Sequence, residues 1–88
     1  MIYEVRIKKQ ALKGLPKLPE VVQEKLAFLV QDLMERGPVQ PSWRNYSKLG
    51  SDKYHCHLNY SFVACWTHDK GTIIIEVYYV GSRENAPY

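Results

Sequence analysis

The sequence predicts an α+β fold in which a small antiparallel β-sheet has N-terminal helices packed on one of its faces. Two patterns lead to this prediction. Apolar residues recur at helical spacing between residues 20 and 36, whereas several shorter segments alternate apolar and polar residues as half-buried strands do. With 88 residues, the chain has room for one domain, residues 1–88.

The chain begins with a predicted strand and a short predicted helix. Residues 2–8 alternate apolar and charged side chains, which is typical of a half-buried strand. Residues 9–13 are predicted to form a short helix that stops at Gly14, a residue suited to a left-handed helix end. Residues 15–19 then form a connector to the next helix.

The strongest helical pattern covers residues 20–36. Its apolar side chains recur every three or four residues and so share one face: Val22, Leu26, Leu29, Val30 and Leu33. Pro19 fits the first turn, where its missing N–H is not needed, and Gly37 with Pro38 ends the helix. We expect the apolar face to pack on the sheet.

The remaining chain is predicted to form strands. A short edge strand is expected at residues 43–46, followed by a turn at residues 48–52. Further strands are predicted at residues 53–58, 61–66 and 72–80. Residues 59–60 are a candidate tight turn, and residues 68–71 predict a hairpin turn in which Gly71 takes a positive φ. The last strand is apolar on nearly both faces, which suits a central position.

Charge is unevenly distributed along the chain, although the net charge is only +3. The segment before residue 20 is strongly basic, and the predicted main helix is mostly acidic. One surface could therefore face a polyanion. The alternative is an ordinary solvated surface of mixed charge.

Cys56 and Cys65 lie in predicted strands and form no CxxC pattern. We expect them to be buried free thiols, as in a protein of the reducing cytoplasm. Arg6, Lys8 and Lys9 interrupt any early apolar run, so the sequence predicts no signal peptide. No apolar run approaches the ~18–20 residues of a transmembrane helix, so we expect no membrane association.

Two histidines share one side of the strand predicted at residues 53–58, because alternate residues of a strand point the same way. Internal cleavage of RNA needs a base for the ribose 2′-OH, an acid for the leaving 5′-oxygen, and cations for the phosphate charge. Histidine, with an unperturbed pKa of about 6.5, can serve as either acid or base. Arginine matches phosphate with a planar fork, and tyrosine can stack on a base. His55, His57, Arg83 and Tyr88 supply these groups with no metal or cofactor, if the fold brings them together.

Other interpretations of these residues remain open. A His-x-His pair on a strand can bind zinc, but it needs a third ligand, such as Cys65 or His68. The two histidines can also be ordinary surface residues. Arg83 alone would then be a solvated charge, and Tyr88 a frayed chain end.

Over nearly its whole length, the chain resembles the RelE-like toxins of bacterial and archaeal toxin–antitoxin pairs, within the RelE/ParE superfamily. The resemblance rests on the order of elements, the amphipathic helix, and motifs at residues 8–16, 48–50, 54–58, 62–66 and 76–88. It implies a RelE-like fold and a toxin that cleaves mRNA by metal-independent attack of the 2′-OH on the adjacent phosphate, commonly on the ribosome. It also implies a cognate antitoxin protein that wraps the toxin and covers its site.

Site residues carry over from the resemblance position by position. Basic residues common at alternate positions of the family's middle strand are replaced here by His55 and His57. The family's C-terminal Gly-x-Arg, followed shortly by a tyrosine, is matched by Gly81, Arg83 and Tyr88. The resemblance therefore implies that the two histidines act as acid and base, without assigning which does which. Arg83 would stabilise phosphate charge, and Tyr88 would stack on a base or orient the ribose.

One family position differs. The arginine that often follows a tyrosine in the next strand is absent here, where Tyr60 precedes Ser61. Glu84 is an additional acid–base candidate. Two alternatives to the nuclease therefore stay open. One is a ParE-like toxin that poisons DNA gyrase on the same fold, and the other is a catalytically weakened module that binds RNA or an antitoxin.

Basic residues outside this set are predicted to bind the phosphate backbone of mRNA and of the ribosome. They are Lys8, Lys9, Lys13, Lys17, Lys48 and Lys53.

Overall fold

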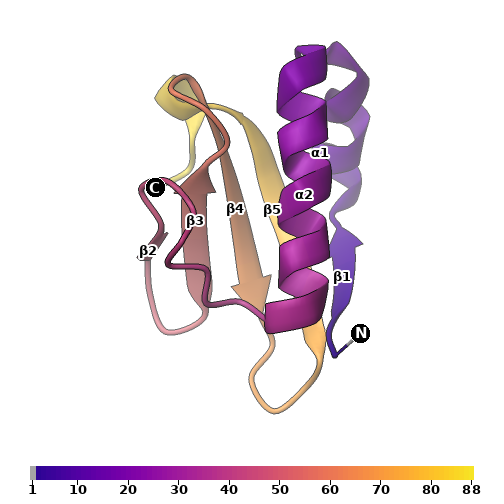
Figure 1. Ribbon diagram of the computed structural model, residues 1–88, viewed down its shortest axis with the longest axis vertical. Helices are drawn as coiled ribbons and strands as arrows, with labels where there is room; N and C mark the ends of the chain where they lie inside the picture. The colour runs from indigo at the N-terminus through magenta and orange to yellow at the C-terminus, as the bar shows by residue number, and fades with distance from the viewer. Residues whose placement is uncertain (1) are drawn as a thin grey trace.

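In the computed structural model, which describes residues 2–88, two α-helices lie against one face of a five-stranded sheet (Figure 1). The α+β prediction is confirmed. The elements in chain order are β1 (Glu4–Ile7), α1 (Lys9–Gly14), a 3₁₀ turn (Leu15–Lys17), α2 (Glu20–Arg36), β2 (Ser47–Lys48), β3 (Lys53–His57), β4 (Phe62–His68), β5 (Ile74–Ser82) and a second 3₁₀ turn (Arg83–Asn85). Within residues 2–88, neither α-helix combines the length and apolar character needed to cross a bilayer.

The strands are arranged in the order β1-β5-β4-β3-β2. The predicted antiparallel pattern holds for β2 with β3, β3 with β4, and β4 with β5, but β1 runs parallel to β5. The sheet is therefore mixed. A parallel neighbour needs a long crossover connection, and the helices that follow β1 begin that connection.

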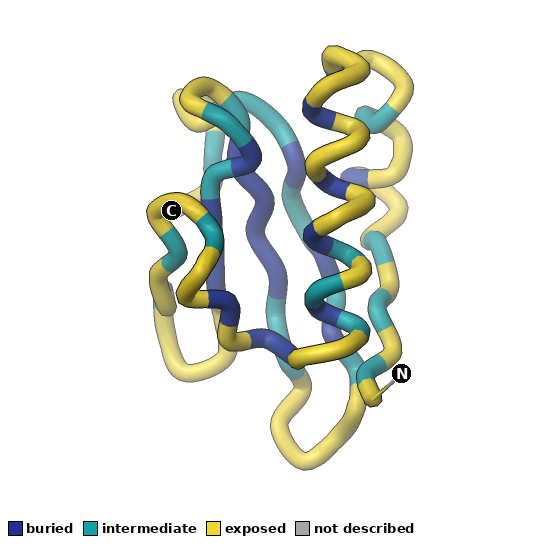
Figure 2. The backbone as a smooth tube through the Cα atoms, viewed as in Figure 1, coloured by how far each residue is buried: buried dark blue, intermediate teal, exposed yellow. Residues whose placement is uncertain are grey.

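Helix α2 has the predicted bounds and packs on the sheet with the predicted face. Its buried side chains are Val22, Leu26, Leu29 and Leu33, while Val30 is only half-buried. They meet the inward-facing side chains of the central strands, among them Tyr54, Cys56, Ala64, Trp66, Ile75 and Val77. Figure 2 shows this core as buried segments on the sheet-facing side of α2 and along the middle strands.

The connection between the helices differs from the prediction. Gly14 keeps a right-handed conformation, with φ −82°, so the left-handed end expected there is wrong. Leu15 also stays helical, and its N–H donates to the Leu12 carbonyl. The chain then tightens into a 3₁₀ turn, whose start accommodates Pro16. Pro19 precedes α2 as its extended N-cap residue and is not part of the first turn.

The left-handed conformation occurs instead at the C-terminal end of α2. Gly37 has φ +90°, and a Cβ at this position would lie 2.7 Å from the Tyr3 ring. The positive φ favours glycine here, and a larger side chain would also displace the Tyr3 ring. The backbone N–H groups of Ile2 and Tyr3 donate to the Met34 carbonyl at 3.1 and 3.0 Å, which ties the entry of β1 to this end of the helix.

The edge strand lies later than predicted. Residues 43–46 form turns, in which Asn45 adopts φ +53°, a conformation that interrupts an extended chain. The short strand β2 follows at Ser47–Lys48. The indole N–H of Trp43 instead donates to a carboxylate oxygen of Asp32 on α2 at 2.8 Å, so this loop is attached to the helix layer.

The other predicted strands are confirmed with shifted ends. The hairpin between β4 and β5 contains Gly71 at φ +83°, as predicted. Cys56 and Cys65 are buried free thiols, also as predicted. A bulge interrupts the β4–β5 register, because Cys65 pairs with Tyr79 and Trp66 with Val77, which leaves Tyr78 as the extra residue.

Candidate functional site

The two histidines of β3 lie on the sheet face opposite α2. Their neighbours Tyr54 and Cys56 belong to the core, so the strand alternation directs His55 and His57 to the other side. The two imidazole ring centroids are 5.6 Å apart. His55 is 8% exposed, whereas His57 is half-buried, so His57 is the more accessible of the two to a ligand.

His55 is held from two sides. Its Nδ1 shares a 2.9 Å hydrogen bond with the Ser47 hydroxyl, because β2 pairs Ser47 directly opposite it. The ring of Tyr88 lies with its centroid 4.5 Å from that of His55. The C-terminal residue is therefore not a frayed end, since it folds back onto the histidine.

Arg83 reaches the site from the 3₁₀ turn after β5. Its backbone N–H donates to the Ser61 carbonyl at 2.9 Å, which fastens this turn to the β3–β4 connection. Its guanidinium carbon lies 4.9 Å from the centroid of the Tyr60 ring, and Nη1 donates to the Tyr60 carbonyl at 3.4 Å. Arg83 is therefore an exposed cation whose guanidinium lies over the Tyr60 ring.

The electrostatics of the site lower the pKa of both histidines. Burial lowers the pKa of His55 first, followed by the charge of His57. Burial also lowers the pKa of His57, followed by the charges of Arg83 and Arg44. Both imidazoles are therefore mostly neutral at pH 7, which is the form that accepts a proton.

Tyr88 keeps its phenolic proton at neutral pH. Burial is the largest cause that raises its pKa, the neighbouring Cys65 adds to it, and Arg83 acts in the opposite direction. The hydroxyl can therefore donate a hydrogen bond to a ribose or phosphate oxygen.

The structure adds side chains that the sequence did not single out. The Ser47 hydroxyl orients His55. The backbone carbonyl of Arg44 accepts a hydrogen bond from the His57 N–H at 2.8 Å. Tyr79 lies over Gly81, where a Cβ would be 2.8 Å from the phenol oxygen, and donates to the Ser82 carbonyl at 2.7 Å. Of these residues, only Gly81 could be noticed in the sequence, as a glycine near the end of a strand. The other contacts depend on strand pairing and on the turn at residues 43–46.

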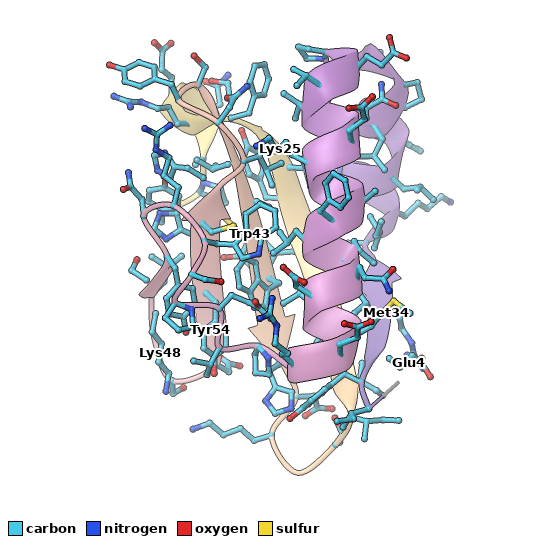
Figure 3. All side chains as sticks on the ribbon, viewed as in Figure 1. Glu4, Lys25, Met34, Trp43, Lys48 and Tyr54 are labelled. Atoms are coloured by element: carbon cyan, nitrogen blue, oxygen red, sulfur yellow. The ribbon has the colours of Figure 1, made fainter. Side chains whose placement is uncertain are left out.

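A hollow of about 310 Å³ lies beside His57. It is lined by Lys25, Ser42, Trp43, Arg44, His57, Leu58 and Asn59. Of the lining residues labelled in Figure 3, Lys25 comes from α2 and Trp43 from the loop before β2. Two of its lining residues, Lys25 and Arg44, are basic, which suits a phosphate group.

The six lysines predicted to contact RNA are all exposed but do not form one patch. Lys53 shares a strand face with the histidines, whereas Lys48 pairs opposite Tyr54 and lies 5.8 Å from that ring, on the other face. Lys13 lines a groove of about 390 Å³ between α1 and β5. Lys8 precedes α1, Lys9 is its first residue, and Lys17 ends the 3₁₀ turn that follows it. Their contact with RNA stays a prediction.

Of the two residues considered as a third zinc ligand, Cys65 pairs opposite His55 in the sheet, whereas His68 is distant from the histidine pair. His68 lies at the far end of β4, where its Nε2 is 3.0 Å from the Thr72 carbonyl oxygen. Burial raises the pKa of the Cys65 thiol to about 11, which disfavours the thiolate that zinc binds. Among residues 2–88, no three His, Cys, Asp or Glu side chains gather in a way that could hold a metal ion.

Solved structures share this fold. The isolated RelE toxin of E. coli matches with a TM-score of 0.74 and 22% identity, over 97% of this chain and 88% of that one. A chain of the archaeal RelE–RelB complex from Pyrococcus horikoshii matches with a TM-score of 0.70 and 22% identity, over 98% of this chain and 100% of that one. A chain of the YoeB–YefM toxin–antitoxin complex from Staphylococcus aureus matches with a TM-score of 0.69 and 16% identity, over 88% of this chain and 92% of that one. No protein-family model matches the sequence, and no curated protein does either. The chain therefore has the fold of the RelE and YoeB structures.

Proposed function

We propose that this protein is the toxin of a type II toxin–antitoxin system, an endoribonuclease that cleaves mRNA on the ribosome and so inhibits translation. The observation that carries the proposal is the meeting of His55, His57, Arg83 and Tyr88 on one face of a RelE-like sheet. These side chains come from β3 and from the C-terminal segment, which are distant in sequence. Their types match the base, acid, cation and stacking group that RNA cleavage needs.

In the proposed reaction, one histidine takes the proton of the ribose 2′-OH. The 2′-oxygen then forms a bond to the adjacent phosphorus while the bond to the 5′-oxygen breaks. The second histidine, in its protonated form, gives its proton to that 5′-oxygen. The products are a 2′,3′-cyclic phosphate and a 5′-hydroxyl. Arg83 stabilises the negative charge that builds on the phosphate, and Tyr88 stacks on a base or orients the ribose.

The proposed regulator is a cognate antitoxin protein that covers this face of the sheet. The support comes from the matching chains of P. horikoshii and S. aureus, which were solved in complexes with RelB and YefM. A segment laid over His57 and Arg83 would exclude RNA from both residues. A cytoplasmic location follows from the proposed substrate.

The decisive experiment incubates the purified protein with ribosomes programmed with a defined mRNA and maps the new 5′ ends. We expect cleavage that continues in the presence of a metal chelator and leaves 5′-hydroxyl ends. DNA breaks that depend on gyrase, without RNA cleavage, would instead support the ParE-like alternative. Binding to programmed ribosomes without cleavage would support the catalytically weakened module, for which the absent arginine at Ser61 is the specific indication.

The pH dependence of cleavage should be bell-shaped, with its maximum below about pH 6.5. Both histidines have lowered pKa values, so the protonated acid becomes scarce as pH rises above their pKa values. At lower pH the base is itself protonated, and the rate falls again. The measurement is the apparent second-order rate constant of cleavage between pH 5 and 8, which reports the unbound enzyme. A rate that rises steadily to pH 8 would contradict a histidine acid.

A further inference from the structure

The turn between β3 and β4 presents a tyrosine that the proposed chemistry does not use. Tyr60 is 71% exposed, the most exposed of the large apolar or aromatic side chains among residues 2–88. The turn that carries it is nevertheless well fixed, because the Asn59 side-chain oxygen accepts from the N–H groups of Ser61 and Phe62, both at 2.9 Å. An exposed ring on a fixed turn is a suitable platform for a flat ligand.

Tyr60 forms one unit with Arg83. The guanidinium carbon lies over the ring, 4.9 Å from its centroid, Nη1 donates to the Tyr60 carbonyl, and the backbone N–H of Arg83 donates to the Ser61 carbonyl. A guanidinium placed over the ring occupies one of its two faces. The high exposure of Tyr60 leaves the other face open to solvent.

The same unit lines a hollow of about 340 Å³ at this end of the sheet. Its lining residues are Tyr60, Ser61, Ser82, Arg83 and Glu84. Ser61 is small, which keeps the hollow open beside the ring. The Glu84 carboxylate can accept hydrogen bonds from base N–H groups, and the Ser82 hydroxyl, which already accepts from the Glu84 N–H, still has a proton to donate.

We propose that Tyr60, backed by Arg83, binds the nucleobase of the nucleotide next to the cleaved phosphodiester. This inference rests on the proposed ribonuclease function and adds a base-binding subsite to it. If Arg83 holds the reacting phosphate, an adjacent base has the Tyr60 ring within reach. Stacking on an aromatic ring needs only the flat face of a base, so the subsite tolerates different bases.

The first test compares Tyr60→Leu and Tyr60→Phe with the wild-type protein on programmed ribosomes under single-turnover conditions. Tyr60→Leu should lower the apparent second-order rate constant of cleavage about 5- to 100-fold, and Tyr60→Phe should stay near wild type. The matched control is Phe28→Leu, because Phe28 is 65% exposed on α2 and should not affect cleavage. A Tyr60→Leu variant with the wild-type rate would overturn the inference.

The second test separates base binding from mere positioning of Arg83. An mRNA that carries a single abasic nucleotide is prepared for each position around the cleaved bond. At one position, the missing base should lower the cleavage rate of the wild-type protein by about the same factor as Tyr60→Leu lowers it on normal mRNA. On that abasic mRNA, Tyr60→Leu and the wild-type protein should cleave at the same rate. If the Tyr60→Leu penalty persists on every abasic mRNA, Tyr60 only positions Arg83 and the subsite is wrong. Absence of cleavage by the wild-type protein would instead reject the proposed function itself.

Discussion

Replacing His57 with alanine should lower the rate of mRNA cleavage by about 10²–10⁴-fold, the usual loss when a group that transfers a proton is removed. His57 is the more accessible histidine of the pair, and its charge is coupled to that of Arg83. The measurement is single-turnover cleavage on programmed ribosomes, together with relief of growth arrest in cells that express the variant. Arg83→Ala should relieve the arrest as well, because the phosphate loses its positioned cation.

Stability must be measured alongside activity, since an unfolded protein would also be inactive. The half-buried ring of His57 makes little contact with the core, so the variant should unfold within about 1 kcal/mol of the wild type. His68→Ala is the matched control, because His68 lies at the opposite end of β4 and should be dispensable for cleavage. Undiminished toxicity of both His57→Ala and Arg83→Ala would show that the site has been placed wrongly.

Local signals account for the parts of the fold that could be predicted. Helix α2 has its predicted bounds because the apolar repeat and the Gly37–Pro38 ending are both contained in the segment itself. The parallel pairing of β1 with β5 was not predictable in this way, since it joins residues about 70 positions apart. The positive φ of Asn45 displaced the edge strand, and nothing in the local alternation indicated it.

In the candidate site, too, local features could be predicted from the sequence, whereas contacts between distant segments could not. Strand alternation places His55 and His57 on one face, and this could be predicted from β3 alone. The hydrogen bond between Ser47 and His55 depends on the register of β2, and the contact between the Arg44 carbonyl and the His57 N–H depends on how the loop at Arg44 returns to β3. The proposed role of Tyr60 rests on its contact with Arg83, which joins the β3–β4 turn to the segment after β5 and is not revealed by the spacing of residues.

The face behind the histidines is supported by three stacked aromatic rings. Trp66 is fully buried, and its ring lies 6.1 Å from that of Tyr54 and 6.3 Å from that of Tyr46. Its indole N–H donates to the Pro38 carbonyl at 3.1 Å, just after the end of α2. Tyr54 immediately precedes His55 on β3, so this cluster fixes the strand that carries the site.

Trp66→Ala should therefore lower the free energy of unfolding by about 3–5 kcal/mol, the range for removing a buried large aromatic side chain. The loss combines a cavity between α2 and the sheet with a buried Pro38 carbonyl that no longer has its donor. A domain of this size has a total stability of about 5–15 kcal/mol, so toxicity should fall through loss of folded protein. Urea denaturation of the purified variant measures the effect, with Phe28→Ala as the exposed aromatic control, expected within about 0.5 kcal/mol of wild type. If Trp66→Ala unfolds at the wild-type urea concentration, the cluster does not support the site. If Trp66→Ala unfolds at a lower urea concentration but its folded fraction cleaves mRNA at the normal rate, the aromatic cluster affects stability alone. His57→Ala should behave differently, because it should abolish cleavage in a protein that stays folded.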